Sequence, residues 1–360
     1  MPFSIRYNRG KEGESMSENK SRRWKLIVNI LTILALVGLI YAVRSQIVET
    51  ITSVGRINYW ALFLMIPAQM LSYHSFSRMY LYLFKMLGDK INYKKMLKVT
   101  LELNFVNNVF PSGGVSGFSY FGLRMKSQGV STGRATLVQM MRFILLFISF
   151  QILLFLGLAM LAFEGKASGF LLLVAGSLAT FLFIGTLAAA FIVGSKARIN
   201  GFFNYIAKAL NRVIHIVRPK HPETINLARV ERGFTELHEN YMVFKNNPRV
   251  LQMPLLYALL ANFAEVMTIY VVYIAFGEFV NPGAIIIAYA VANFAGLVSV
   301  LPGGVGIYEA LMTGILVSAG VPAGLSISVT IMYRVLSMGL QLPPGYYFYH
   351  RALREPTVDT

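Results

Sequence analysis

Long apolar stretches separated by short polar connections dominate the chain. A helix that crosses the hydrocarbon of a bilayer needs about 20 mostly apolar residues. Six stretches meet this requirement, and they cover about residues 24–43, 59–83, 135–163, 168–194, 250–276 and 323–349. The pattern therefore predicts an all-α polytopic membrane protein with six spanning helices.

Two further apolar stretches, residues 96–122 and 283–320, are interrupted in the middle by Pro and clustered Gly. Pro lacks a backbone N–H donor and clashes with the preceding turn, and Gly lets the chain reverse its direction. We therefore expect each stretch to be a re-entrant hairpin, which returns to the side of the membrane from which it entered. Unpaired backbone is tolerated in a bilayer only beside protein or a water-filled cavity, so each hairpin tip predicts a polar pocket.

The two broken stretches match each other, which indicates an internal duplication. The first reads NFVNNVFPSGGVSG (104–117) and the second reads NFAGLVSVLPGGVG (293–306). Arg142 follows the proline of the first copy by 31 residues, and Arg334 follows the proline of the second by 32. Because an odd number of predicted spans separates the hairpins, we expect the second copy to be inverted. Inverted repeats with broken helices that meet near the midplane are a recurrent plan of transporters.

Composition and charge agree with a membrane protein and orient it. Of the 360 residues, 56% are hydrophobic and only 14% are charged, which is too apolar for a soluble domain of this length. The net charge is +17, and if both ends are cytoplasmic, 27 of the 33 Lys and Arg fall on the cytoplasmic side. Cytoplasmic loops carry such an excess, so the charge needs no nucleic-acid partner. We expect a multi-pass protein of the inner (plasma) membrane with cytoplasmic termini.

These features divide the chain into five parts, namely a cytoplasmic basic tail (1–25), a first membrane half (26–194), a cytoplasmic arm (195–249), a second membrane half (250–349) and a cytoplasmic tail (350–360). Apolar residues recur at helical spacing on both sides of the sequence RPKHP in the arm, which predicts two amphipathic helices. These helices either pack together against the anionic leaflet or form a regulatory arm that binds a partner.

Deep charges are the candidate chemistry. Arg142 and Arg334 lie far inside predicted spans, where an arginine costs roughly 2.5–3.5 kcal/mol on insertion scales and normally has a partner in the bundle interior. The deep acids are Glu102, Glu265 and Glu309. We expect these acids to pair with the two arginines. On the sequence alone, two interpretations are open: structural ion pairs that set helix register, or groups that handle a charged substrate or a coupling proton.

The candidate substrate pathway combines the hairpin residues with the deep polar residues. Its members are Asn104, Pro111, Gly113, Gly114, Gly117, Arg142, Glu265, Asn293, Pro302, Gly303, Gly304, Gly306, Glu309 and Arg334. Helix N-termini after the glycines would point backbone amides at an anion. We expect no catalytic residue, metal or cofactor, because the chain has no cysteine and its five histidines lack metal-ligand spacing. Without a nucleotide-binding motif, any driving force would come from an ion or from the lipid gradient.

Three stretches resemble a known family. They are PSGGVSG (111–117) with its YFGLR continuation (120–124), PGGVGIYEA (302–310) and the pair Tyr333-Arg334. Together they are similar to the flippase-like transmembrane region of lysylphosphatidylglycerol synthases, over roughly residues 24–350. The resemblance implies lipid translocation, with the headgroup pathway at Glu309, Arg334 and the two glycine hairpins. Full-length members add a soluble domain that transfers lysine from a charged tRNA to phosphatidylglycerol. Only about ten residues follow the last predicted span here, so we expect a stand-alone member without aminoacyl transfer.

The favoured function is therefore a membrane transporter that moves a lipid or a lipid-linked substrate between leaflets through a polar midplane pocket. One alternative is an enzyme that modifies lipid headgroups, which assays of the purified protein on defined lipids would reveal. Another is a non-transporting assembly or regulatory protein, which would lose its function on deletion of residues 199–245. The expected partners are membrane lipids and not nucleic acid. The cargo, its direction, the coupling ion and the oligomeric state are left open by the sequence.

Overall fold

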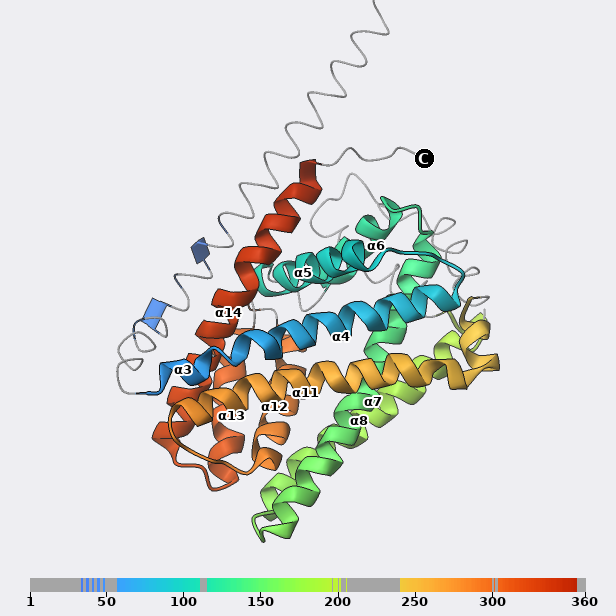
Figure 1. Cartoon of the computed structure of the whole chain (residues 1–360). Helices are drawn as coiled ribbons and strands as arrows, with labels where there is room; N and C mark the ends of the chain where they lie inside the picture. Colours follow the sequence, from blue (N-terminus) through green and yellow to red (C-terminus); the bar gives the residue numbers. More distant parts are fainter. Residues whose placement is uncertain are drawn as a thin grey trace, which may run out of the picture.

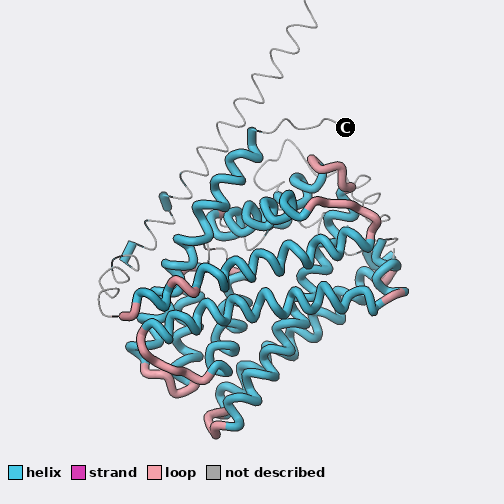
Figure 2. The backbone as a smooth tube through the Cα atoms, viewed as in Figure 1, coloured by secondary structure: helices cyan, strands magenta, loops and turns pink. Residues whose placement is uncertain are grey.

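The computed structural model describes residues 57–110, 115–195, 197–199, 240–299 and 304–354, together with isolated residues elsewhere. Within this part of the chain the fold consists of helices and their connections, and it contains no strand (Figure 2). The described helices that are long and apolar enough to cross a membrane are Thr132–Phe163, Gly169–Ile192, Pro248–Ala275 and Ala323–Arg354. The prediction of an all-α polytopic membrane protein is confirmed.

The helices fall into two sets that follow the duplication. The first set comprises α3 (Tyr59–Leu62), α4 (Met65–Met86), α5 (Tyr93–Val109), α6 (Val115–Lys126), α7 (Thr132–Phe163) and α8 (Gly169–Val193). The second set comprises the 3-10 helix η1 (Pro248–Leu251) and the α-helices α11 (Gln252–Ala275), α12 (Pro282–Val298), α13 (Ile307–Ser318) and α14 (Ala323–Arg354). In each set, the first long helix is followed by two short helices and then by a long one, and the first set ends with the additional helix α8.

Local sequence signals set where these helices begin and end. The side chains of Asn92, Ser131 and Asn281 accept hydrogen bonds from the first backbone amides of α5, α7 and α12, so each is an N-cap. A glycine with positive φ follows the ends of α4, α6, α7, α11 and α13, at Gly88, Gly129, Gly165, Gly277 and Gly320. Glycine adopts this conformation without steric cost, so the helices stop there.

Each Pro/Gly-broken stretch forms two helices that pack against each other. These are α5 with α6 in the first copy and α12 with α13 in the second. Gly117 on α6 allows close packing on α5, because a Cβ at this position would overlap the side chain of Asn107. In the second hairpin, a Cβ on Gly304 would lie 3.0 Å from the Cα of Gly296. The broken stretches are thus helix–break–helix hairpins, as their sequences predict.

The two copies are inverted relative to each other. Helices α4 and α11, which open the two sets, lie side by side and run in opposite directions (Figure 1). The backbone amide of Asn58 donates to the carbonyl of Ala275 at 2.9 Å, and Gln69 reaches Thr268 at 3.4 Å near the middle. Toward the other end, the rings of Tyr82 and Tyr257 stack at 5.6 Å. This antiparallel pairing of equivalent helices confirms the predicted inverted repeat.

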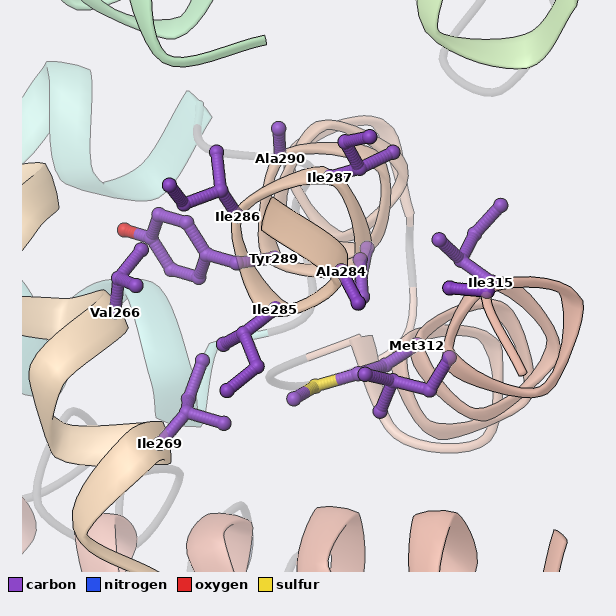
Figure 3. Packing of buried hydrophobic residues seen from close by; sticks show 14 of the residues in the cluster. Val266, Ile269, Ala284, Ile285, Ile286, Ile287, Tyr289, Ala290, Met312 and Ile315 are labelled. Carbon is purple, nitrogen blue, oxygen red and sulfur yellow. The ribbon is translucent and has the colours of Figure 1, made fainter. Parts of the chain in front are cut away.

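The hairpins also pack across the repeat. Helix α5 of the first hairpin packs on α14, and α12 of the second hairpin packs on α7. Each hairpin therefore contacts the long helix that follows the other hairpin. Figure 3 shows α12 within the main core, where Ile285 and Tyr289 face Val266 and Ile269 of α11, while Met312 of α13 approaches from the other side. Helix α12 thus packs in this core mainly with helices of its own copy, and Phe150, Leu153 and Leu154 of α7 join it from the other copy.

One predicted span has a different character from the rest. The stretch 59–83 is helical and corresponds to α3 and α4, and α4 has 22 residues, or about 33 Å. It is not among the helices that are apolar enough to cross a membrane by composition. The reason is a polar stripe that includes the buried side chains of Gln69, Ser72 and Ser75. The hydrophobic pattern alone located this helix but not its polar face.

Several predicted elements lie outside the described residues. These are the tail 1–25, almost all of the span 24–43, most of the arm between 206 and 239, and the tips of the two hairpins. At the other end, α14 continues to Arg354, past the predicted boundary at 349.

Candidate functional site

A polar cavity of about 240 Å³ lies between the two inverted copies, and a smaller one of about 60 Å³ adjoins it. Both cavities are lined by Phe76, Asn104, Asn107, Arg142, Glu265 and Gln341. We call the two cavities together the chamber. The remaining residues that line it are Ser72, Tyr73, Tyr80, Thr100, Leu103, Asn108, Gln139, Phe143, Tyr289, Asn293, Gly296, Tyr308, Tyr333, Arg334, Ser337 and Met338. The lining comes from α4, α5 and α7 of the first copy and from α11, α12, α13 and α14 of the second.

Helical periodicity explains how these side chains converge. Ser72, Tyr73 and Phe76 on α4 follow the three- and four-residue spacing that places side chains on one helix face. Arg334, Ser337 and Gln341 do the same on α14. Both helices keep their apolar faces for packing or for lipid, so the polar faces enclose the chamber.

Glu265 on α11 is held by neutral donors. Its Oε1 accepts a hydrogen bond from Ser72 Oγ at 2.7 Å, and its Oε2 accepts from Gln69 Nε2 at 3.3 Å and from Tyr333 OH at 3.5 Å. No Lys or Arg in the described part of the chain forms an ion pair with it. The expectation that Glu265 pairs with a deep arginine is therefore wrong, because serine, glutamine and tyrosine occupy its oxygens.

A chain of amide hydrogen bonds extends from this carboxylate across the repeat. Gln341 Nε2 donates to Gln69 Oε1 at 2.8 Å, and Asn104 Nδ2 donates to Gln341 Oε1 at 2.8 Å. Asn104 Nδ2 also donates to the hydroxyl oxygen of Tyr73 at 2.7 Å. The predicted pathway residue Asn104 thus joins the first hairpin to α14 of the other copy and to α4 of its own.

Arg334 pairs with one of the three deep acids, as the sequence predicts, and this acid is Glu309. Its Nε lies 3.1 Å from Glu309 Oε1, and both side chains are about one-tenth exposed. The other carboxylate oxygen of Glu309 accepts from the backbone amide of Gly306 at 2.6 Å, at the start of α13. The guanidinium also lies 4.5 Å from the ring centre of Tyr308. The second hairpin is therefore fastened to α14 by a hydrogen-bonded ion pair.

Arg142 on α7, the counterpart of Arg334, has no such partner. It forms no ion pair or hydrogen bond with the residues that the structure describes, and its buried Nε lacks an acceptor. Its guanidinium instead lies among the rings of Phe76, Tyr80 and Phe143, with centroid distances of 5.5, 5.8 and 5.3 Å. Such cation–π contacts stabilise a cation without using its N–H donors.

Glu102 was expected to pair with a deep arginine of the chamber, and this expectation is wrong. The carboxylate is only 1% exposed, and its Oε2 accepts from Arg124 Nε at 3.0 Å and from Tyr120 OH at 2.9 Å. Arg124 and Tyr120 both belong to α6. The acid therefore ties the two helices of the first hairpin together, and Arg142 is left without a carboxylate.

The predicted pathway residues separate into three groups. Asn104, Arg142, Glu265, Asn293 and Arg334 line the chamber. Gly117, Gly304, Gly306 and Glu309 do not line it but shape the hairpins or hold Arg334. Pro111, Gly113, Gly114, Pro302 and Gly303 lie outside the described residues.

The prediction missed several chamber residues, among them Tyr73, Asn107, Gln139 and Gln341, and it also missed Gln69, which bonds to Glu265 and Gln341. A detectable signal was present, because polar residues recur at helical spacing within otherwise apolar helices, as on α4 and α14. Searching the spans for such polar stripes would have found most of them. Within the described residues, no three His, Asp or Glu side chains gather as metal ligands would.

Comparison with known proteins agrees with this architecture. Residues 26–345 match the family described as the lysylphosphatidylglycerol synthase TM region, which is most of the chain. The chain belongs to this family. The resemblance seen in the hairpin motifs is thereby confirmed.

Two relatives of this member of the lysylphosphatidylglycerol synthase TM-region family are known as UPF0104 membrane proteins. The chain is 32% identical over 116 residues to one from Methanothermobacter thermautotrophicus, covering 32% of this chain and 33% of the relative. It is 24% identical over 102 residues to one from Pyrococcus horikoshii, covering 28% and 30%. Each alignment spans about a third of the relative's length. The relatives therefore support a membrane protein and add no activity.

Proposed function

We propose that this protein moves a lipid, or a lipid-linked substrate, between the two leaflets of the membrane. The observation that carries the proposal is the polar chamber between the inverted copies, which holds Arg142, Glu265 and Arg334. A charged headgroup is costly in hydrocarbon unless polar groups replace its water. The chamber supplies such groups, and at about 240 Å³ it fits a headgroup and leaves the acyl chains in the lipid.

The repeat supplies a means of alternating access. In transporters with inverted repeats, one repeat rocks against the other around a site near the midplane. Here the hydrogen bonds from Asn104 to Gln341 and from Gln341 to Gln69 cross between the copies beside the chamber. In our proposal these bonds break and re-form as the chamber changes the side on which it opens. Membership of a family named for a phospholipid synthase supports a lipid as the cargo.

The test uses the purified full chain in vesicles that carry a headgroup-labelled phospholipid in both leaflets. The measurement is the loss of label beyond the outer-leaflet share after a membrane-impermeant quencher is added. We expect the wild-type protein to accelerate exchange and Glu265→Gln to slow it. Arg78→Gln is the matched control, because Arg78 is exposed and does not line the chamber. Exchange no faster than in protein-free vesicles, or equal exchange by wild type and Glu265→Gln, would refute transport through the chamber.

In our proposal the lipid is chemically unchanged after it has moved between the leaflets. Mass spectrometry of lipid recovered from the same vesicles tests this point. A new headgroup product that depends on the protein would favour a membrane enzyme instead.

We also propose that the protein lies in the plasma membrane, or in the inner membrane of a cell with two membranes. Both termini would then lie in the cytoplasm. The chain has no cysteine, so single cysteines introduced at Ser127 and Glu164 can be labelled without background. These residues flank α7, which has 32 residues and a length of about 48 Å. We expect an impermeant thiol reagent on intact cells to label Glu164→Cys and not Ser127→Cys. Labelling of both from one side would overturn the orientation.

A further inference from the structure

The chamber contains one deep cation without an anionic partner. Arg334 is neutralised by Glu309, and Glu265 accepts hydrogen bonds from three neutral side chains. Arg142 contacts three aromatic rings, and its guanidinium forms no ion pair or hydrogen bond within the described residues. A guanidinium with five donors held in a low-dielectric site attracts an anion with several acceptor oxygens.

Other unused polar groups face the same cavity. Ser337 on α14 lines it, and its buried Oγ has no hydrogen-bond partner among the described residues. Asn107 on α5 also lines it, and its buried Oδ1 is likewise without a partner. Ser337 and Asn107 thus come from different copies and line the same cavity as Arg142.

Phosphate matches this set of groups better than other headgroup components. A phosphoryl group carries negative charge and has several oxygens, and arginine binds it through two parallel N–H bonds. Hydroxyl-only sugar headgroups offer no charge to compensate Arg142. An ammonium group beside Arg142 would be repelled by the like charge of the guanidinium. The carboxylate of Glu265 already accepts three hydrogen bonds from protein side chains.

On this basis we propose that Arg142 binds the phosphoryl group of the cargo, so that the substrate class is phosphate-bearing lipids. This inference rests on the proposed function and narrows its substrate. Phosphodiester lipids and polyprenyl phosphates share this chemistry, and the arms of the experiment distinguish them. The Ser337 hydroxyl and the amide nitrogen of Asn107 complete the site by donating to oxygens of the same headgroup.

The experiment is lipid binding to the purified full chain, measured by native mass spectrometry at equal lipid concentration. The probes are phosphatidylglycerol, a polyprenyl monophosphate and a glucosyl diacylglycerol, which lacks phosphate. We expect the wild-type protein to retain at least one phosphate lipid about tenfold more than the glycolipid, and Arg142→Gln to lose this preference. Arg142→Lys, which keeps the charge but not the fork, should lose less, and Arg78→Gln should bind as the wild type does.

The outcomes separate this inference from the proposed function. Equal retention of phosphate lipid by wild type and Arg142→Gln, or no preference of the wild type over the glycolipid, overturns the phosphate site. The second criterion needs no variant, so a failure of Arg142→Gln to fold leaves the test intact. Arg142-dependent lipid binding without exchange in vesicles would support the phosphate site and refute transport. Lipid exchange that is equally fast in wild type and Arg142→Gln would support transport and refute the phosphate site.

Discussion

The two copies of the repeat place their buried acids differently. In the first hairpin, Glu102 on α5 pairs with Arg124 on α6, so the hairpin is closed on itself. In the second hairpin, Glu309 on α13 pairs with Arg334 on α14, so the hairpin is fastened to the next long helix. One consequence is that Arg142 and Arg334, which occupy equivalent positions, have opposite electrostatic situations. A near-symmetric backbone therefore carries an asymmetric charge distribution.

This difference shows that an arginine predicted to lie deep in a membrane span can be either part of an ion pair or a cation without a carboxylate partner. A buried ion pair contributes little beyond the cost of desolvating its members, but removing one member leaves an uncompensated charge. Substitution of Arg334 or Glu309 would leave such an uncompensated charge. Substitution of Arg142 would not, because no carboxylate of the described residues pairs with it. Stability should therefore respond to the paired residues and ligand binding should respond to Arg142. The predictions below test this contrast, and they run from the largest expected effect to the smallest.

The largest effect is expected from breaking the pair inside the first hairpin. Glu102 is 1% exposed, so Glu102→Gln leaves Arg124 without its carboxylate in a buried place. We expect a loss of about 3–5 kcal/mol in the free energy of unfolding. Thermal unfolding of the detergent-solubilised protein measures this, with Glu278→Gln in the α11–α12 loop as a surface control. A variant as stable as the wild type would contradict the internal closure of this hairpin.

A smaller effect is expected at the second pair, because both side chains keep some exposure. Glu309→Gln or Arg334→Gln alone should destabilise the protein by about 1–3 kcal/mol. The double variant should recover part of this loss, since neither charge is then left alone. Thermal unfolding of all four proteins forms a double-mutant cycle. Strictly additive losses would mean that the two residues do not interact as the structure indicates.

At Arg142 the expected effect on stability is close to zero. Arg142→Gln removes a cation that no carboxylate balances, so we expect a change below about 1 kcal/mol in the free energy of unfolding. The same unfolding assay in lipid-free detergent gives the measurement. A loss as large as that of Arg334→Gln would show that Arg142 has a structural role and would end the contrast between the copies.

The smallest effect is expected outside the membrane region. Lys166 Nζ donates to Glu164 Oε2 at 2.8 Å and thereby holds the pKa of that carboxyl below its usual range. A lowered folded-state pKa stabilises above the unfolded pKa, and the contribution is lost as the pH falls through the folded value. Because both side chains are well exposed, Lys166→Ala should leave the thermal midpoint at pH 7 unchanged within error. A clear shift of the thermal midpoint would contradict this, because it would show that the exposed Lys166–Glu164 pair contributes to stability.

Much of the fold was predictable because its signals are local. Long, mainly apolar runs predicted α7, α8, α11 and α14, and Pro with clustered Gly located the two hairpins. The inversion followed from counting spans, which is a property of the chain order. The start of α7 at Thr132 rather than 135 reflects the N-cap Ser131, a signal that a hydrophobicity pattern does not contain.

The site was less predictable because its pairings depend on three-dimensional distance. Arg124 was counted among the cytoplasmic basic residues, yet it is the partner of Glu102. Its role depends on how α6 folds back on α5, which spacing along the chain does not reveal. The general expectation that deep acids pair with deep arginines is correct for Glu309 and Arg334. Glu265 lies on another helix, and no feature of the sequence near it indicates that neutral donors surround its carboxylate.

The antiparallel contact between α4 and α11 has a consequence for the origin of the molecule. Two equivalent helices that face each other across a two-fold axis form the same kind of interface as a symmetric homodimer. Two separate half-length polypeptides, inserted in opposite orientations, would make this contact with each other. Joining them in one gene ends the requirement that both halves be identical. Each half can then accumulate its own substitutions, so Arg334 of the second copy has Glu309 beside it while Arg142 of the first copy has no such acid.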